Sequence, residues 1–147
     1  MIEEFIRYTE LADREILTVF SATNKDMPEA ERLFSHVLNA QHIWVSRIEA
    51  SPLQYEIWQV HPKETFASIS TENFRLIKES LAKQDLDTAI TYHDSRGNEY
   101  KNKVAEMFMQ MLNHSTYHRG QIVSMLKKEG ITPPVTDYIY FKRKNLL

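Results

Sequence analysis

The sequence contains no cysteine, which excludes disulfides, thiolate metal ligands, iron–sulfur clusters and a thiol nucleophile. Glycine is scarce, at three in 147 residues, and this scarcity disfavours a turn-rich all-β fold. No apolar run approaches the roughly 20 residues of a membrane-spanning helix. The first residues, MIEEF, lack the basic and apolar regions of a secretory signal. We therefore expect a cytoplasmic protein, with no membrane partner, that is built from long helices.

Neither sign of charge dominates, since 18 Lys and Arg face 20 Asp and Glu for a formal net charge of -2. This balance gives no general attraction to nucleic acid, and we expect no such partner. The short basic run at residues 142–144 is interpreted as a solvated end. A chain of this length can bury roughly 70% of the surface that it exposes when unfolded. We expect one domain over residues 1–147.

Apolar residues recur at helical spacing in four segments. These segments are residues 2–22, 28–50, 66–83 and 103–128. Asp26 and Asn102 are expected to cap the second and fourth of these helices. Residues 88–93 and 98–101 flank the turn sequence DSRG and predict a small hairpin, and an extended tail follows the last helix. The expected fold is all-α, a four-helix bundle with a short β-hairpin between the third and fourth helices.

Two histidines of the last long helix, His114 and His118, fall on its inner face. At about 100° per residue they lie about 60° and 20° from the centre of the apolar stripe. Their four-residue spacing places the rings one turn apart, where they can share one ion. His36 lies about 60° from the stripe centre of the second helix, and we predict that it reaches across to the pair. Three neutral imidazoles leave a coordination position for water or substrate, as in reactive metal sites.

The other histidines are expected at the surface. His42 lies about 180° from the stripe of its helix, His61 falls in a loop and His93 on a strand. An inward histidine is more often a hydrogen-bonded core residue than a ligand, but three buried histidines without partners would each cost about 1 to 3 kcal/mol. We therefore predict a metal site. Nitrogen ligands favour zinc, nickel, copper or ferrous iron over magnesium and calcium, with zinc and nickel foremost.

Three further polar residues are candidates for this site. Asp13 lies on the apolar stripe of the first helix. It either accepts a hydrogen bond from a ligand histidine or acts as a base beside the metal, or else it pairs with Arg119 or reaches water. Arg119 and Gln121 flank the inward stripe on opposite sides, so each either orients a substrate or braces neighbouring helices.

A strip of small residues lies on the outer side of the same helix. It consists of Thr116, Gly120 and Ser124. A glycine inside a helix costs roughly 1 kcal/mol relative to alanine, and close approach of another helix or subunit would explain it. The strip predicts a homodimer, and a plainly solvated glycine is the alternative.

The string HSTYHRGQI at residues 114–122 resembles the signature of the DinB family, the damage-inducible-type metal-binding four-helix bundles. Three other stretches are similar to the family pattern. They are residues 35–44, 92–100 and 130–138. In the first of them His36 precedes an Ile-Trp pair by seven residues. The first helix departs from the family, because relatives often show Tyr-Asn-x-Trp-Ala-Asn where this chain has YTELAD, ending at Asp13. The resemblance implies a divalent metal held by the three inward histidines.

The resemblance leaves the reaction open. Some members of the wider superfamily resemble thiol-dependent S-transferases and a mycothiol-dependent isomerase, in which the metal would lower the pKa of a thiol cofactor. We therefore expect a metal-dependent enzyme that acts on a small-molecule substrate, foremost an S-transferase with a low-molecular-weight thiol as cofactor. A metal-dependent hydrolase and a non-catalytic metal-binding or stress-response module are the alternatives.

Overall fold

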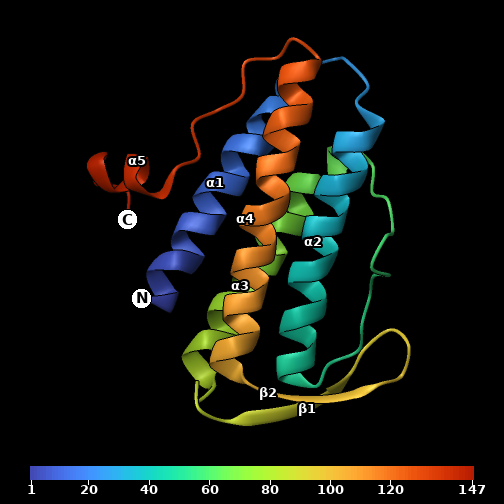
Figure 1. Cartoon of the computed structure of the whole chain (residues 1–147), viewed down its shortest axis with the longest axis vertical. Coiled ribbons are helices and arrows are strands. Elements are labelled where there is room, and N and C mark those ends of the chain that lie inside the picture. Colours follow the sequence, from blue (N-terminus) through green and yellow to red (C-terminus); the bar gives the residue numbers. More distant parts are fainter.

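The computed structural model describes residues 1–147 and is dominated by four long helices. The elements in order are α1 (Ile2–Ala22), α2 (Pro28–Glu49), the short 3-10 helix η1 (Lys63–Thr65), α3 (Phe66–Lys83), β1 (Ala89–His93), β2 (Glu99–Lys103), α4 (Val104–Lys128) and α5 (Tyr138–Arg143). Helices α1 to α4 lie side by side, and the antiparallel hairpin β1–β2 crosses one end of them (Figure 1). The predicted all-α fold with a hairpin before the last long helix is confirmed.

Each long helix packs against two others. Helix α2 contacts α3 and α4, and α1 contacts the same two helices from the other side. The most extensive contact of all joins α2 to α4. This seam matters for function, because the three inward histidines of the sequence lie on these two helices.

The two largest clusters of the apolar core lie one toward each end of the bundle. In the cluster distant from the hairpin, the rings of Phe20, Phe34 and Phe66 have centroids 5.1 to 5.5 Å apart. In the cluster beside the hairpin, Phe74 and Phe108 are almost completely buried. Burial of a side chain of this size contributes about 1.5 to 3 kcal/mol relative to exposure. Apolar packing therefore holds the long helices together at both ends of the bundle.

Between the two clusters every long helix buries polar side chains, which we call the polar layer. Its members are Thr9, Asp13, Gln41, Asn73, Ser115 and Arg119. Arg119 Nη1 donates to Asp13 Oδ1 at 2.8 Å, and Gln41 Nε2 donates to Asp13 Oδ2 at 2.7 Å. Gln41 also donates to Ser115 Oγ at 3.2 Å. Because buried polar groups are costly unless they are hydrogen-bonded, this layer defines how the four helices align.

The N-caps predicted for two helices are displaced by one residue. Met27 precedes α2 in place of Asp26, and its side chain is buried in the core. Burial of this large apolar side chain therefore determines where the helix starts. Lys103 precedes α4 in place of Asn102, and the Lys103 N–H donates to Glu106 at 2.9 Å. Asn102 instead stays within β2, which runs directly into α4.

The predicted extended tail is wrong for residues 138–143, which form α5. Phe141 on this short helix is buried and packs edge-on against Tyr8, with ring centroids 5.9 Å apart. The Tyr8 hydroxyl donates to the carbonyl of Thr136 at 2.7 Å, which ties the preceding segment to α1. Six residues are too few for an apolar repeat to reveal a helix.

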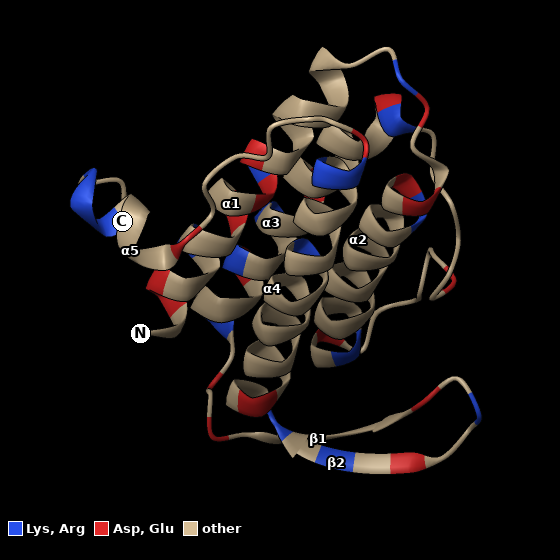
Figure 2. Cartoon of the chain, turned by 45° about the horizontal axis from the view of Figure 1, so that its top comes forward, with Lys and Arg blue, Asp and Glu red and all other residues tan.

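The middle of α2 contains no charged residues. Figure 2 shows acidic and basic positions interspersed along α1 and the hairpin, whereas the central turns of α2 carry neither. No Lys, Arg, Asp or Glu lies between Arg32 and Arg47, and nearly all of this stretch is buried. None of the helices combines the length and apolarity that spanning a membrane would need.

Candidate metal centre

The structure brings His36 of α2 together with His114 and His118 of α4. The ligand nitrogens of the three side chains lie within 4.8 Å of one another. The Nε2 atoms of His36 and His114 are 3.0 Å apart. Ring centroids within the group are 4.4 to 4.9 Å apart. We call this group the histidine cluster, and it contains the three histidines that the helical faces selected.

The spacing of the nitrogens suits one shared ion. Two nitrogens bound to one tetrahedral zinc at about 2.0 to 2.1 Å lie about 3.3 Å from each other. The 3.0 Å between the Nε2 atoms of His36 and His114 is close to that value. Since all ligand nitrogens lie within 4.8 Å, a ring movement of at most about 1.5 Å would complete the site.

The outer nitrogens of two cluster members are held by acceptors. His36 Nδ1 donates to the carbonyl oxygen of Ile57 at 2.9 Å. His118 Nδ1 donates to Gln121 Oε1 at 2.7 Å. Because these acceptors fix the proton on Nδ1, each ring presents the lone pair of Nε2 to the centre of the cluster. Contacts of this kind orient the histidine ligands of known metal sites.

The third ring, that of His114, does not find hydrogen-bond partners for both of its nitrogens within the chain. His36 Nε2 carries no hydrogen, so the 3.0 Å contact requires one on His114 Nε2. His114 Nδ1 is buried and has no hydrogen-bond partner. Burial, together with the neighbouring His118 and His36, lowers the pKa of His114 to about 4. The ring is therefore neutral near pH 7, which is the form that binds metals.

Aromatic side chains stand at the opening of the cluster. The Trp58 ring stacks on His36 at 3.8 Å between centroids and 10° between planes, and it is 48% exposed. The Tyr117 ring lies 5.0 Å from His118 and is also exposed. Trp58 was not among the site residues predicted from the sequence. The only signal was its position among large side chains in an irregular segment.

Two histidines expected at the surface are buried, and these predictions were wrong. His42 is 4% exposed because the loop after α2 folds back over it, and the Gln54 N–H donates to His42 Nε2 at 3.0 Å. His61 is 6% exposed, and its Nε2 lies 2.6 Å from Asn39 Oδ1. His93 lies on β1 and is exposed, as expected. None of the three belongs to the histidine cluster.

Asp13 and Arg119 lie in the polar layer and make no hydrogen bond to the histidine cluster. Their side chains are 1% and 3% exposed and form an ion pair at 2.8 Å. Burial raises the pKa of Asp13, while the Arg119 charge and the hydrogen bonds from Gln41 and Arg119 oppose that rise. Arg119 also donates to the Tyr8 hydroxyl at 3.1 Å, so it braces α4 against α1. Gln121, in contrast, is exposed and touches a cluster histidine.

The fold and the site together define the class of this protein. It is a helical bundle in which three histidines, with no carboxylate among them, converge at one seam. The model of the DinB family matches residues 13–145, and the chain belongs to that family. It is similar to "Protein DinB" of Bacillus subtilis (strain 168), with 25% identity over 141 residues. That match covers 88% of this chain and 77% of the relative. No solved structure gives a significant match.

Proposed function

We propose that His36, His114 and His118 bind one divalent transition metal, and that the protein is a metal-dependent enzyme for a small-molecule substrate. The observation that carries this proposal is the convergence of three imidazoles, two of them oriented from outside by Ile57 and Gln121. Imidazole ligands favour zinc or nickel over the oxygen-seeking magnesium and calcium.

The reaction that we propose is transfer to a low-molecular-weight thiol. A divalent ion bound by three protein ligands supplies a free position and lowers the pKa of a thiol placed there. The chain contributes no carboxylate to the histidine cluster, and the buried Asp13 is engaged by Arg119. A hydrolase would need a general base in reach of the attacking water. The absence of one supports a nucleophile that arrives with the substrate.

The aromatic residues at the opening would serve this reaction by binding and by exclusion of water. Trp58 and Tyr117 offer apolar ring faces on two sides of the cluster. An electrophile with an apolar body would bury its surface there at about 25 cal/mol per Å². Trp58 also stacks on the His36 ring, so one residue would both position a ligand and contact the substrate.

Metal titration by calorimetry tests the binding proposal. We expect one zinc or nickel ion per chain, with much weaker binding in His36→Ala, His114→Ala and His118→Ala. His42→Ala and His61→Ala are matched controls, because both remove a buried histidine outside the cluster. Unchanged binding in the His118→Ala protein would contradict the proposal.

Turnover of the metal-loaded protein tests the reaction. A set of low-molecular-weight thiols is combined with alkylating electrophiles, and thiol consumption is followed with and without the protein. We expect a rate that requires metal and is lost in His118→Ala. Thiol-independent hydrolysis of esters or amides would instead favour the hydrolase. A large metal-dependent rise in melting temperature with no turnover of either kind would favour the non-catalytic module.

A further inference from the structure

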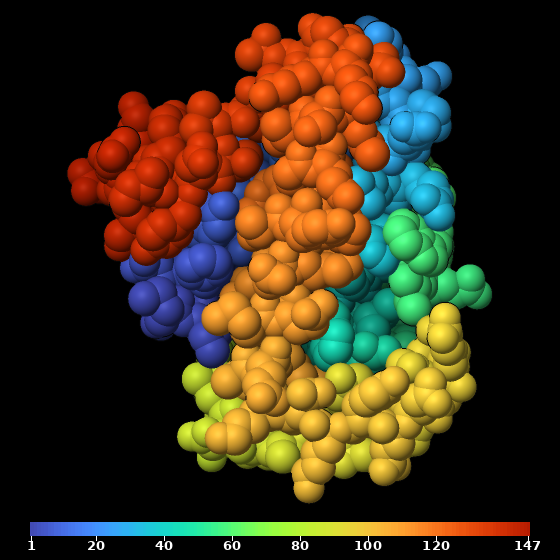
Figure 3. Space-filling view, in the orientation of Figure 1, coloured from blue at the N-terminus to red at the C-terminus, as the bar shows by residue number.

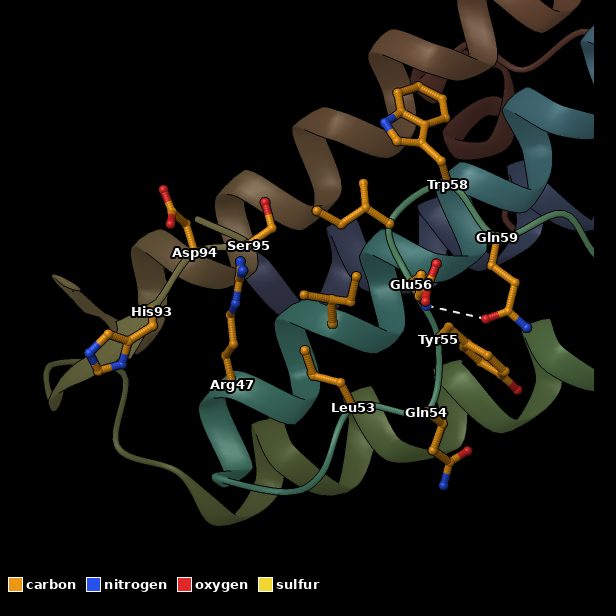
Figure 4. A pocket seen from close by; sticks show the side chains of 12 residues that line it. Arg47, Leu53, Gln54, Tyr55, Glu56, Trp58, Gln59, His93, Asp94 and Ser95 are labelled. Atoms are coloured by element: carbon orange, nitrogen blue, oxygen red, sulfur yellow. Dashed lines mark hydrogen bonds between the residues drawn. The ribbon is translucent and has the colours of Figure 1, made fainter. Parts of the chain in front are cut away.

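A second feature on the same side of the bundle is a pocket of about 670 Å³ below the histidine cluster. It lies between the C-terminal half of α2, the loop of residues 53–59 and the hairpin residues 93–95. The space-filling view shows the surface hollowed between α4, α2 and the hairpin (Figure 3). Figure 4 shows the side chains that line this pocket. We call it the Arg47 pocket.

Arg47 is the basic residue of the pocket, and it forms no ion pair within the chain. Its Nε is buried without a hydrogen-bond partner. The rings of Trp44 and Tyr92 lie 4.8 and 5.1 Å from its guanidinium carbon and hold the group in place. The side chain reaches along the pocket toward Ser95 (Figure 4). An arginine stays charged in proteins, and a half-buried unpaired charge is costly.

The acidic residues of the pocket do not neutralise this charge. Asp94 accepts hydrogen bonds from the backbone N–H groups of Arg96 and Asn98 at 2.8 and 2.9 Å, so its carboxylate is engaged by its own turn. Glu56 is exposed to solvent and forms no ion pair with any group of the pocket. Neither residue forms an ion pair with Arg47, on which Asp94 acts only through space.

Part of the lining is apolar and can contact a hydrocarbon body. Ile43, Leu53 and Ile57 form part of the wall. A planar guanidinium binds a carboxylate through two parallel hydrogen bonds, and its charge strengthens both of them. The pocket therefore suits a small molecule with a carboxylate at one end and an apolar chain behind it.

The pocket is continuous with the supports of the histidine cluster. Ile57, which accepts the hydrogen bond of His36, and Trp58, which stacks on it, both line the pocket. His36 and Arg47 are eleven residues apart, so they share one face of α2 within about 20° and lie about 16 Å apart along its axis. Helical side chains lean toward the N-terminus, which brings the guanidinium closer to the cluster.

We propose that the Arg47 pocket binds the carboxylate of a small-molecule ligand, with Arg47 as the hydrogen-bond donor. That this ligand is the substrate or thiol of the metal centre rests on the proposed function. The carboxylate site itself depends only on Arg47 and its surroundings, so it can be tested with and without metal.

The test compares pentanoate with its uncharged analogue pentanamide, each titrated up to ~50 mM into the full chain, metal-free and zinc-loaded. Nuclear magnetic resonance follows the Nε–H signal of Arg47 and the indole N–H signals of Trp44 and Trp58. We expect saturable shifts with pentanoate and at least about tenfold weaker binding of pentanamide, since hydrogen bonds to charged groups contribute that much.

Two variants assign the binding to the pocket. Arg47→Leu should abolish the preference for pentanoate. Arg32→Leu is the matched control, because Arg32 also stacks on a tryptophan, at 4.4 Å from the Trp58 ring, but does not line the pocket. It should bind pentanoate as the unmodified chain does.

Three results would overturn the proposal: no saturable shift with pentanoate, equal binding of the two probes, or undiminished binding to a folded Arg47→Leu protein. If that variant does not fold, the ratio of the two probes in the unmodified chain decides. Pentanoate binding to the metal-free chain together with failure of the metal titration would uphold this site and refute the metal centre alone.

Discussion

Replacing Asp13 by asparagine separates the two roles that its position on α1 allows. Asparagine has nearly the same shape but only one side-chain oxygen, so the change removes the charge and one of the two acceptors that Gln41 and Arg119 use. It leaves the guanidinium of Arg119, which is 3% exposed, without its counter-ion. Breaking a buried ion pair from one side costs about 3 to 5 kcal/mol. We therefore expect a loss of that size in the free energy of unfolding.

The loss corresponds to a fall in melting temperature of about 6 to 20 °C for a chain of this size. Urea unfolding followed by circular dichroism measures the loss in the free energy of unfolding. The control is Glu79→Gln, which breaks the ion pair of Glu79 with Arg75, where both side chains are more than half exposed. An exposed pair contributes at most about 1 kcal/mol.

The same variant decides the function of Asp13. Because its hydrogen bonds go to Arg119 and Gln41 and not to the histidine cluster, zinc affinity of folded Asp13→Asn should equal that of the unmodified chain. A stability loss below about 1 kcal/mol combined with tenfold weaker zinc binding would refute the structural reading. It would assign Asp13 to the metal centre.

Three further predictions follow from individual contacts. Gln121→Leu removes the acceptor of His118 Nδ1 and should weaken zinc binding about tenfold with little change in stability; calorimetry that finds equal affinity would contradict this. Burial lowers the pKa of His42 and of His61. The folded state therefore stays neutral while the unfolded state takes up protons below about pH 6.5, so metal-free stability should fall as the pH falls from 7.5 to 5, and constant urea midpoints would exclude it. Sedimentation should find a dimer of the 17.4 kDa chain, and Gly120→Arg, at an exposed position with open space around it, should give monomers if the predicted strip is the interface.

The sequence was sufficient for the bundle and for the composition of the histidine cluster. Both depend on which face of a helix a residue occupies, and a repeat of apolar residues reports that directly. The faces of His36 and His114 were enough to predict their convergence across the α2–α4 seam.

The burial of His42 and His61 was beyond the same reasoning. A repeat describes one helix and carries no information on what covers its outer face. The loop after α2 covers His42 through the hydrogen bond from Gln54, and Asn39 binds His61. The unpaired guanidinium of Arg47 becomes visible only when the hairpin and the loop are in position.

The coordination of a bound ion tests the central claim most directly. X-ray absorption of the zinc-loaded chain should show three imidazole nitrogens at about 2.0 to 2.1 Å from the metal, and two in the His118→Ala protein. A first shell without three imidazoles, or one that the His118→Ala substitution leaves unchanged, would contradict the account.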